Sequence, residues 1–408
     1  MKGKTIGGLL LLLTASLLAL YLYFSLAPAN VTPAALQHFS REEILAGHKY
    51  RQQKQVLFVL RFALQIMLLA TVALGRGGNL LEKWVLSAVQ GRRFLGVLLF
   101  FLVLWVGLRL VNLPISFYSS YVLEHRWGFS SQTMASWWAD YIKGAAMDLV
   151  FSVVGAALFF LALRKWPTSW WLPAGLFMAG WLIVQTFLWP SFVAPLYNRF
   201  EPATEPQVVA MVKNLAQKAD VPVQQVLVMD ASRRTSKANA YFAGIGRTKR
   251  IVLYDTLLEN YPLNEVEAVV AHEIAHWKLG HIRTGVFWGI VATFAQFYLI
   301  ALVLTSSFSR WQLGHYPLRV WAVTLLFLLL TSFVTSPIQN GISRYMERAA
   351  DKESVALVGN AEGAVALQLN LARGNRSDIV PPPFIEWFAY THPSTLKRIE
   401  LLQQAVKE

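Results

Sequence analysis

Two histidines and a glutamate form the part of the sequence with the clearest chemical meaning. His272-Glu273-Ile274-Ala275-His276 is an H-E-x-x-H sequence. On a helix, residues four apart lie one turn apart on the same face, so both imidazoles can bind one metal ion. Glu273 is offset by one residue, so its carboxylate lies beside the metal, where it can take a proton from an activated water molecule. We therefore predict a zinc site with His272 and His276 as ligands and Glu273 as the general base.

A catalytic zinc ion keeps three protein ligands and one open position, so a third ligand is required. The best candidate is Glu347, on a predicted helix after the last apolar run. Asp351, one turn later, can accept the outer ring proton of a ligating histidine. The alternative is a surface helix whose charges pair at i, i+4. His281 lies nine residues after His272, on about the opposite helix face, so it joins the site only if the helix breaks.

Composition places this chemistry in a membrane protein. Hydrophobic residues make up 55% of the 408 residues and charged residues 15%, which is too apolar for an ordinary soluble chain. Because the chain has no cysteine, any metal must be bound by histidine and carboxylate. The net charge of +14 is explained by basic loops beside anionic lipid headgroups. We expect a lipid bilayer as a partner and no nucleic acid.

About seven apolar runs are long enough to cross the hydrocarbon layer. They lie near residues 6–27, 55–75, 94–115, 147–164, 170–190, 284–306 and 318–336. The first run follows two lysines and resembles a signal peptide, but Tyr21 and Tyr23 suit an interfacial aromatic belt. We therefore expect it to be a retained span.

The runs divide the chain into four parts: transmembrane helices 1 to 5 in 1–190, a polar stretch in 191–283, helices 6 and 7 in 284–336, and a polar tail in 337–408. Two crossings return the chain to the same face, so both polar parts can build one site. The predicted fold is predominantly α, a multi-spanning helical membrane protein with a small α+β zinc-metalloprotease domain. Basic residues of the 191–283 stretch favour a cytoplasmic catalytic side.

The polar stretch shows a helix, a small sheet and a second helix. Spacing predicts a helix over 206–219 and strands over 223–229 and 250–254, with a turn at 244–246. Asn264 and Glu267 form a capping-box pattern for the H-E-x-x-H helix, which runs to about Gly280. Between the strands, 239–244 is predicted to be an edge strand.

An edge strand can bind an extended peptide by main-chain hydrogen bonds, so Asn239, Ala240 and Tyr241 are candidate substrate contacts. Plain sheet structure is nearly as good an interpretation. Near the C-terminus, His392-Pro393 opens a helix that contains Arg398. Proline is common at a first helical position, but His392 near the zinc can instead stabilise the oxyanion of a tetrahedral intermediate.

With these residues in view, the chain resembles the type I CAAX prenyl endopeptidases, integral-membrane zinc proteases that trim isoprenylated C-terminal peptides. The similar segments follow in the family's order: Leu113 to Lys143, Pro195 to Phe200, Asn239 to Phe242, Tyr254 to Leu257, His272 to His281 and Ser343 to Asp351. The resemblance covers about residues 40 to 402.

The resemblance implies zinc ligation by His272, His276 and Glu347, with Glu273 as general base. It also implies that Asn239 binds substrate, that His392 stabilises the transition state, and that Arg398 with Asp351 supports the ligands from outside. Spans of this family enclose a chamber, which would account for Arg61 inside the second span. One departure is Lys237, where the family commonly has histidine.

The predicted function is therefore zinc-dependent endopeptidase activity in a membrane, with one Zn2+ per chain and a peptide substrate. The resemblance suggests removal of the C-terminal tripeptide of prenylated substrates. An alternative is a quality-control protease that acts on misfolded or stalled membrane proteins. A transporter or channel with a His/Glu ion path is a third hypothesis, but its polar groups would lie within spans. A catalytically silent scaffold would have no use for Glu273.

Overall fold

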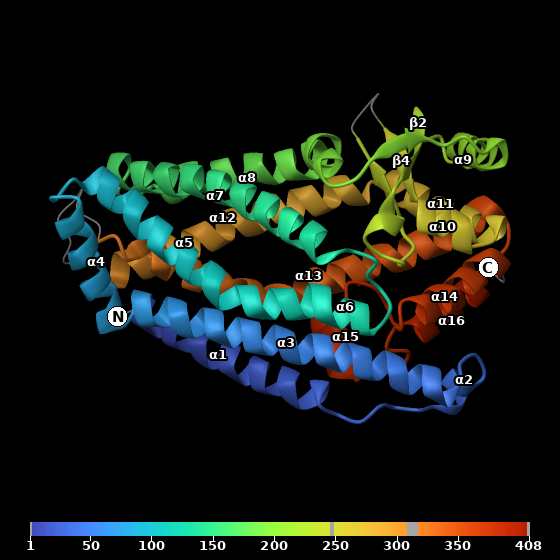
Figure 1. The fold of residues 1–408 in the computed structure, drawn as a ribbon, viewed down its shortest axis with the longest axis horizontal. Coiled ribbons are helices and arrows are strands. Elements are labelled where there is room, and N and C mark those ends of the chain that lie inside the picture. Colours follow the sequence, from blue (N-terminus) through green and yellow to red (C-terminus); the bar gives the residue numbers. More distant parts are fainter. Residues whose placement is uncertain (1, 245–248, 308–316, 406–408) are drawn as a thin grey trace.

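The computed structural model describes residues 2–244, 249–307 and 317–405, and its described part is mostly helical (Figure 1). Seven of the described helices are long and apolar enough to cross a membrane, as predicted. They are α1 (Lys2–Ser25), α3 (Arg41–Ala73), α5 (Arg93–Phe117), α7 (Met134–Lys165), α8 (Trp171–Leu188), α12 (His281–Ser307) and α13 (Val320–Val358). Short helices α2 (Pro33–Leu36), α4 (Arg76–Ala88) and α6 (Leu123–Arg126) connect them.

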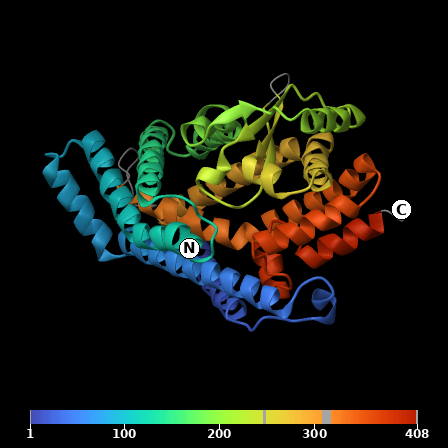
Figure 2. The ribbon, with the colours of Figure 1, turned by 45° about the vertical axis from the view of Figure 1, so that its right-hand side comes forward.

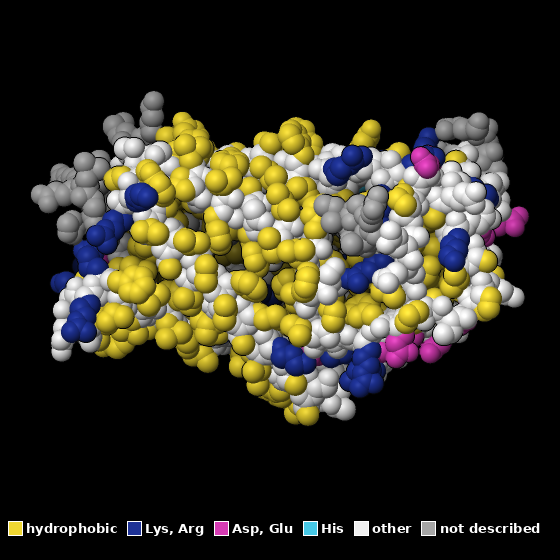
Figure 3. Space-filling view, turned by 90° about the horizontal axis from the view of Figure 1, so that it is seen from above, with side chains coloured by type: hydrophobic (Ala, Val, Ile, Leu, Met, Phe, Trp, Pro, Cys, Tyr) yellow, Lys and Arg dark blue, Asp and Glu magenta, His cyan; other side chains and the backbone are white. Residues whose placement is uncertain are grey.

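The long helices lie side by side and carry apolar residues on their outer surface. Leu12, Leu110 and Leu176 are more than three-fifths exposed, which is expected of side chains that face lipid rather than water. Figure 3 shows hydrophobic side chains spread over the helical part of one face, with lysine and arginine at both ends of the long axis. This distribution matches a protein that spans a bilayer along that axis.

A four-stranded sheet lies at one end of the helices, beside α9 and α11 (Figures 1 and 2). Its strands are β1 (Phe200–Pro202), β2 (Gln225–Met229), β3 (Ala240–Ala243) and β4 (Arg250–Tyr254), in the order β1-β2-β4-β3. β2 and β4 are parallel, and the other two pairs are antiparallel. The predicted strands are confirmed, and β3 is an edge strand. The predicted turn at 244–246 lies mostly outside the described residues.

Three helices complete this unit: α9 (Pro206–Lys218), α10 (Asp255–Asn260) and α11 (Leu263–Lys278). Fully buried apolar residues of α9, β4 and α11 form the core, among them Leu215, Leu253 and Ile274. This core holds α11 against the sheet, because each Å2 of apolar surface removed from water stabilises the fold by roughly 25 cal/mol. The H-E-x-x-H helix therefore has a rigid support.

The predicted capping box is wrong. α11 begins at Leu263, and no side chain caps it. The carbonyl of Pro262 accepts hydrogen bonds from the N–H groups of Glu265 and Val266, so the first turn starts two residues before Asn264. Asn264 therefore lies inside the helix, and the Val266 N–H that its side chain would cap already donates to the Pro262 carbonyl.

The C-terminal part is α13 followed by α14 (Glu362–Gly374), α15 (Pro383–Ala389) and α16 (Thr395–Ala405). α13 contains Pro337 and continues through it without interruption. The predicted division between 336 and 337 therefore falls within one continuous helix, and the four-part domain division stays a prediction. Because α13 packs on α11 as well as on α3, it links the membrane helices to the unit formed by the sheet and α9 to α11.

Candidate metal centre

Residues from α11 and α13 converge on one point. His272 Nε2 lies 3.1 Å from His276 Nε2 and 3.2 Å from Glu347 Oε2, and His276 Nε2 lies 3.4 Å from Glu347 Oε1. These three residues each offer one ligand atom within 4.8 Å of the others. The structure thus brings Glu347 to the two predicted histidine ligands, although it lies 71 residues after His276 in the chain.

The chemistry of this group fits a metal ion. Two imidazole nitrogens and one carboxylate are the donor set of many catalytic zinc sites. Glu347 Oε2 is buried and has no hydrogen bond from any described residue, which is an unusual state for a buried carboxylate oxygen. A cation bound by these three residues would give this oxygen the partner that it lacks and would keep the two Nε2 atoms apart.

The outer nitrogen of His272 faces Asp351. His272 Nδ1 lies 3.0 Å from Asp351 Oδ1. Arg398 of α16 donates from Nε to Asp351 Oδ2 at 2.8 Å and from Nη2 to Asp351 Oδ1 at 2.5 Å. Asp351 therefore sits between the histidine and a guanidinium that fixes its orientation.

His281 also reaches the metal group, which its position in the sequence permits only if the helix breaks. The helix does break: α11 ends at Lys278, Gly280 has a φ of +70°, and α12 begins at His281. The break places His281 Nδ1 2.9 Å from His276 Nδ1. The sequence signal for this break is the glycine just after the helix, because glycine is the usual residue at a left-handed C-terminal cap.

Glu273 and His392 stand beside the ligands. Burial raises the pKa of the Glu273 carboxyl to about 7 against the opposing charge of His272, and a backbone hydrogen bond from Phe242 of β3 lowers it in part. His392 Nε2 lies 3.3 Å from Glu347 Oε2, and its side chain is 54% exposed. A proton-transfer group and a potential hydrogen-bond donor thus flank the ligand set.

The edge strand presents its main chain rather than its side chains to this site. Ala240 is buried in the core under α11, and Tyr241 packs against Tyr254 on the other face of the sheet. Asn239 is exposed, and its carbonyl accepts from the Tyr254 N–H at 3.0 Å. Ala240 and Tyr241 can therefore make the predicted substrate contacts only through their backbone groups.

A cavity of about 550 Å3 lies between α3 and α13, with α1 and α15 at its sides. Arg61 lines it and donates to Asn112 Oδ1 at 3.1 Å, so this intramembrane arginine faces a cavity, as expected. Aromatic rings form much of the remaining wall: Tyr21, Phe58, Phe62, Phe333, Phe388 and Tyr390. The lining face of α13 includes Asn340, which lies two turns before Glu347 on the same helix face.

A basic cluster beside the edge strand was not predicted. Lys237 Nζ lies 2.8 Å from Glu124 Oε2 and 3.0 Å from Tyr50 Oη, and Lys54 Nζ lies 2.6 Å from Glu124 Oε1. The ammonium group of Lys237 also lies 4.2 Å from the centre of the Phe129 ring. The residue that departs from the family pattern is thus held by partners from α3 and α6.

Seven spanning helices, a catalytic sheet-and-helix unit and a His/His/Glu group with an adjacent glutamate define an integral-membrane metalloendopeptidase. The model of peptidase family M48 matches residues 202–406, and the model of the CAAX prenyl protease N-terminal region, with five membrane helices, matches residues 21–199. The chain belongs to peptidase family M48. This membership favours the endopeptidase over the transporter or channel hypothesis.

Several known proteins are similar over most of their length. The uncharacterized metalloprotease YhfN of Bacillus subtilis is 29% identical, over 95% of this chain and 93% of that protein. CAAX prenyl protease 1 of Saccharomyces cerevisiae is 30% identical, over 72% and 69% respectively. The crystal structure of Ste24p from S. mikatae has a TM-score of 0.83 and 25% identity, and the match covers 96% of this chain and 97% of that one. The metalloendopeptidase function and the resemblance to CAAX prenyl proteases are confirmed.

Proposed function

We propose that the metal is zinc, one ion per chain, and that His272, His276 and Glu347 bind it. The observation that supports this most is the convergence of both Nε2 atoms and the Glu347 carboxylate within 3.4 Å of one another. When bound, zinc supplies Lewis-acid polarisation of the scissile carbonyl. Asp351 orients His272, and Arg398 holds Asp351 in place.

The remaining roles follow from position around this group. An extended peptide adds to the free edge of β3, where Asn239 and the main chain of β3 hold it in register. Glu273 takes the proton of the attacking water and passes it to the leaving amine. His392, close to the Glu347 side of the group, donates a hydrogen bond to the oxygen on which negative charge develops.

The proposed substrates are peptides that carry an apolar prenyl chain near the C-terminus, cleaved on the cytoplasmic side. Two features support this choice. The similar proteins of yeast and human are named CAAX prenyl proteases, and an aromatic-lined cavity extends along α13 to Asn340, two turns before Glu347. Basic residues of the catalytic unit favour the cytoplasmic side.

A second candidate is a quality-control protease for misfolded or stalled membrane proteins. It is favoured by Lys237, which replaces the family's usual histidine and puts an ammonium group two residues before Asn239. Such a site would accept a range of unprenylated segments, since main-chain binding at an edge strand does not depend on side-chain identity.

The deciding experiment compares a farnesylated C-terminal peptide with its unprenylated twin, using purified wild type and Glu273→Gln with the metal content of both assayed. We expect one zinc per chain in both proteins, with cleavage by the wild type only. Preference for the farnesylated peptide supports the prenyl-peptide proposal, and equal cleavage of both supports quality control. Absence of zinc from both proteins would refute the metal assignment.

A further inference from the structure

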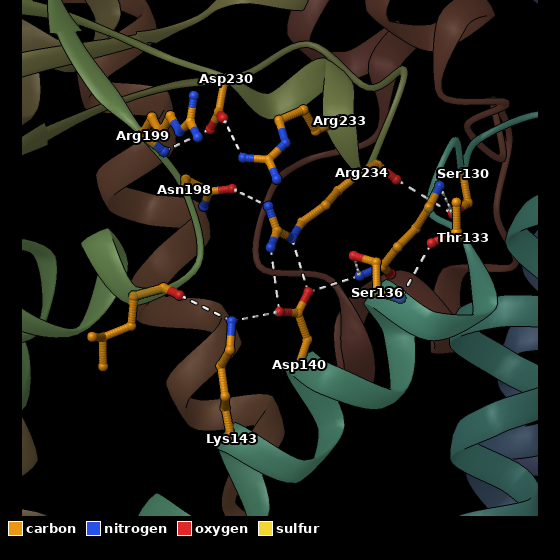
Figure 4. Close-up of polar contacts among 12 residues, drawn as sticks. Ser130, Thr133, Ser136, Asp140, Lys143, Asn198, Arg199, Asp230, Arg233 and Arg234 are labelled. Atoms are coloured by element: carbon orange, nitrogen blue, oxygen red, sulfur yellow. Dashed lines mark hydrogen bonds and ion pairs between the residues drawn. The ribbon is translucent and has the colours of Figure 1, made fainter.

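A second polar network, apart from the metal group, joins α7 to the loop that leads into the edge strand. Figure 4 shows Arg234, in the loop between β2 and β3, reaching Asp140 on α7. Arg234 donates from Nε to Asp140 Oδ2 at 2.9 Å and from Nη2 to Asp140 Oδ1 at 3.3 Å. Their side chains are 20% and 18% exposed. A bidentate, mostly buried ion pair of this kind fixes the relative orientation of the two side chains as well as their distance.

Other side chains hold each partner in place. Arg234 also donates from Nη1 to Asn198 Oδ1 at 3.0 Å, and Gln132 Nε2 donates to Asp140 Oδ2 at 2.7 Å. Lys143 Nζ donates to the Leu196 carbonyl at 3.2 Å and lies 3.5 Å from Asp140 Oδ1. Asp140, Gln132 and Lys143 belong to α7 and the loop before it, so the loop between β2 and β3 is tied to the membrane helices.

The backbone on both sides of Arg234 is docked on the same membrane loop. Thr235 forms an isolated bridge with Ser130, and the Ser236 N–H donates to the Phe129 carbonyl at 3.1 Å. Ser131 Oγ donates to the Ser232 carbonyl at 2.6 Å. Residues 232–236 are therefore fixed only three residues before Asn239, where the proposed substrate edge begins.

We propose that Arg234 and Asp140 are positioning residues for the substrate. β3 has four residues and is paired on one side only, so the direction of its free edge depends on where the preceding loop is held. The ion pair holds that loop against α7 and keeps the edge aligned with Glu273, while neither residue contacts the metal group. This inference rests on the proposed function, in which the peptide adds to β3.

The test is a double-mutant cycle with Arg234→Gln, Asp140→Asn and the double variant. We expect each single variant to raise KM for the peptide about tenfold, the scale of a lost charge-assisted contact, with the zinc content unchanged. The double variant should be no worse than either single one, because both remove the same contact. Arg233→Gln is the matched control, since the neighbouring Arg233 pairs with Asp230 and is 55% exposed; we expect its KM within twofold of wild type.

A measurement that needs no substrate separates this inference from the proposed function. Hydrogen exchange of the backbone amides of residues 232–243 should become faster in Arg234→Gln. It should also become faster in Arg234→Lys, which keeps the positive charge but loses the bidentate contact of the guanidinium with Asp140. Exchange in α9 should stay unchanged. Additive KM effects, an equal effect of Arg233→Gln, or unchanged exchange over 232–243 would overturn the positioning role. If the wild type cleaves neither peptide, the proposed substrate fails, and the exchange result still decides whether the pair holds the strand.

Discussion

At the scale of residues, each of the two proposed histidine ligands has a different partner at its outer ring nitrogen. Both Nε2 atoms face the point of convergence, and the outer Nδ1 atoms face Asp351 and His281 at 3.0 and 2.9 Å. A ligating nitrogen must be free of its proton, so the proton of each ring sits on Nδ1. His281 must then be neutral and accept at its Nδ1.

His281→Ala should therefore weaken zinc retention without removing a ligand. Loss of an outer partner typically lowers metal affinity about 10- to 100-fold, and we expect a change of that size in competition with a chelator. His38→Ala is a suitable control, because His38 lies outside the metal group and its described hydrogen bonds use its backbone N–H and carbonyl. Zinc affinity equal to wild type in His281→Ala would contradict the role of His281.

Asp351→Ala should destabilise the fold itself. Asp351 is 2% exposed and accepts two hydrogen bonds from Arg398, so its removal leaves a buried guanidinium without the carboxylate that it is hydrogen-bonded to. Breaking a buried pair in this way costs about 3–5 kcal/mol. We expect a clearly lower Tm in metal-free protein, whereas Glu353→Ala, which removes a more exposed pair with Lys278, should change the Tm little.

At the scale of elements, the break between α11 and α12 is what admits His281 to the site. A continuous helix would carry His281 to the far side of His272. Gly280 makes the break possible, because its φ of +70° lies in a region that other residues rarely adopt. The site therefore depends on one backbone position that is not itself a ligand.

Gly280→Ala should reduce both stability and zinc retention. A side chain at this φ costs about 1 kcal/mol or more, and an added Cβ would lie 3.1 Å from Arg283 Nη2. Gly285→Ala is the matched control, since a Cβ there meets nothing within 4 Å. We expect a lower Tm and weaker zinc binding for the first variant and neither for the second. Equal behaviour of the two variants would show that the break tolerates a side chain.

At the scale of the whole molecule, the number of spans fixes which loops share a face. Two spans precede Arg92 and five precede Glu205, and both residues are exposed. Because three crossings separate them, these residues lie on opposite sides of the bilayer. Two more crossings bring α14 and α16 to the side of Glu205, where α11 lies.

Orientation can be measured directly, because the chain has no cysteine to replace. Glu205→Cys and Arg92→Cys should react with a membrane-impermeant maleimide from opposite sides of intact cells. For a cytoplasmic catalytic side, Arg92→Cys is labelled in intact cells and Glu205→Cys only after permeabilisation. The reverse pattern would place the site outside, and labelling of both in intact cells would contradict the span count.

The sequence by itself determined the features that depend on local pattern. Long apolar runs predict the seven helices, because a backbone in lipid must satisfy its own hydrogen bonds. Alternation and composition predicted β2 and β4, and the H-E-x-x-H spacing predicted two imidazoles on one helix face. Glu347 was inferred from its place after the last run and from the need for a third ligand.

Only the tertiary structure decided features that depend on groups distant in the chain. Asn264 failed as a cap because Pro262 supplied the first carbonyl of α11, and His281 entered the site because Gly280 turned the chain. The Arg234–Asp140 pair joins residues 94 positions apart. Their spacing in sequence carries no signal of contact, because such pairs form only when packing of whole helices and sheets brings their charges together and removes them from water.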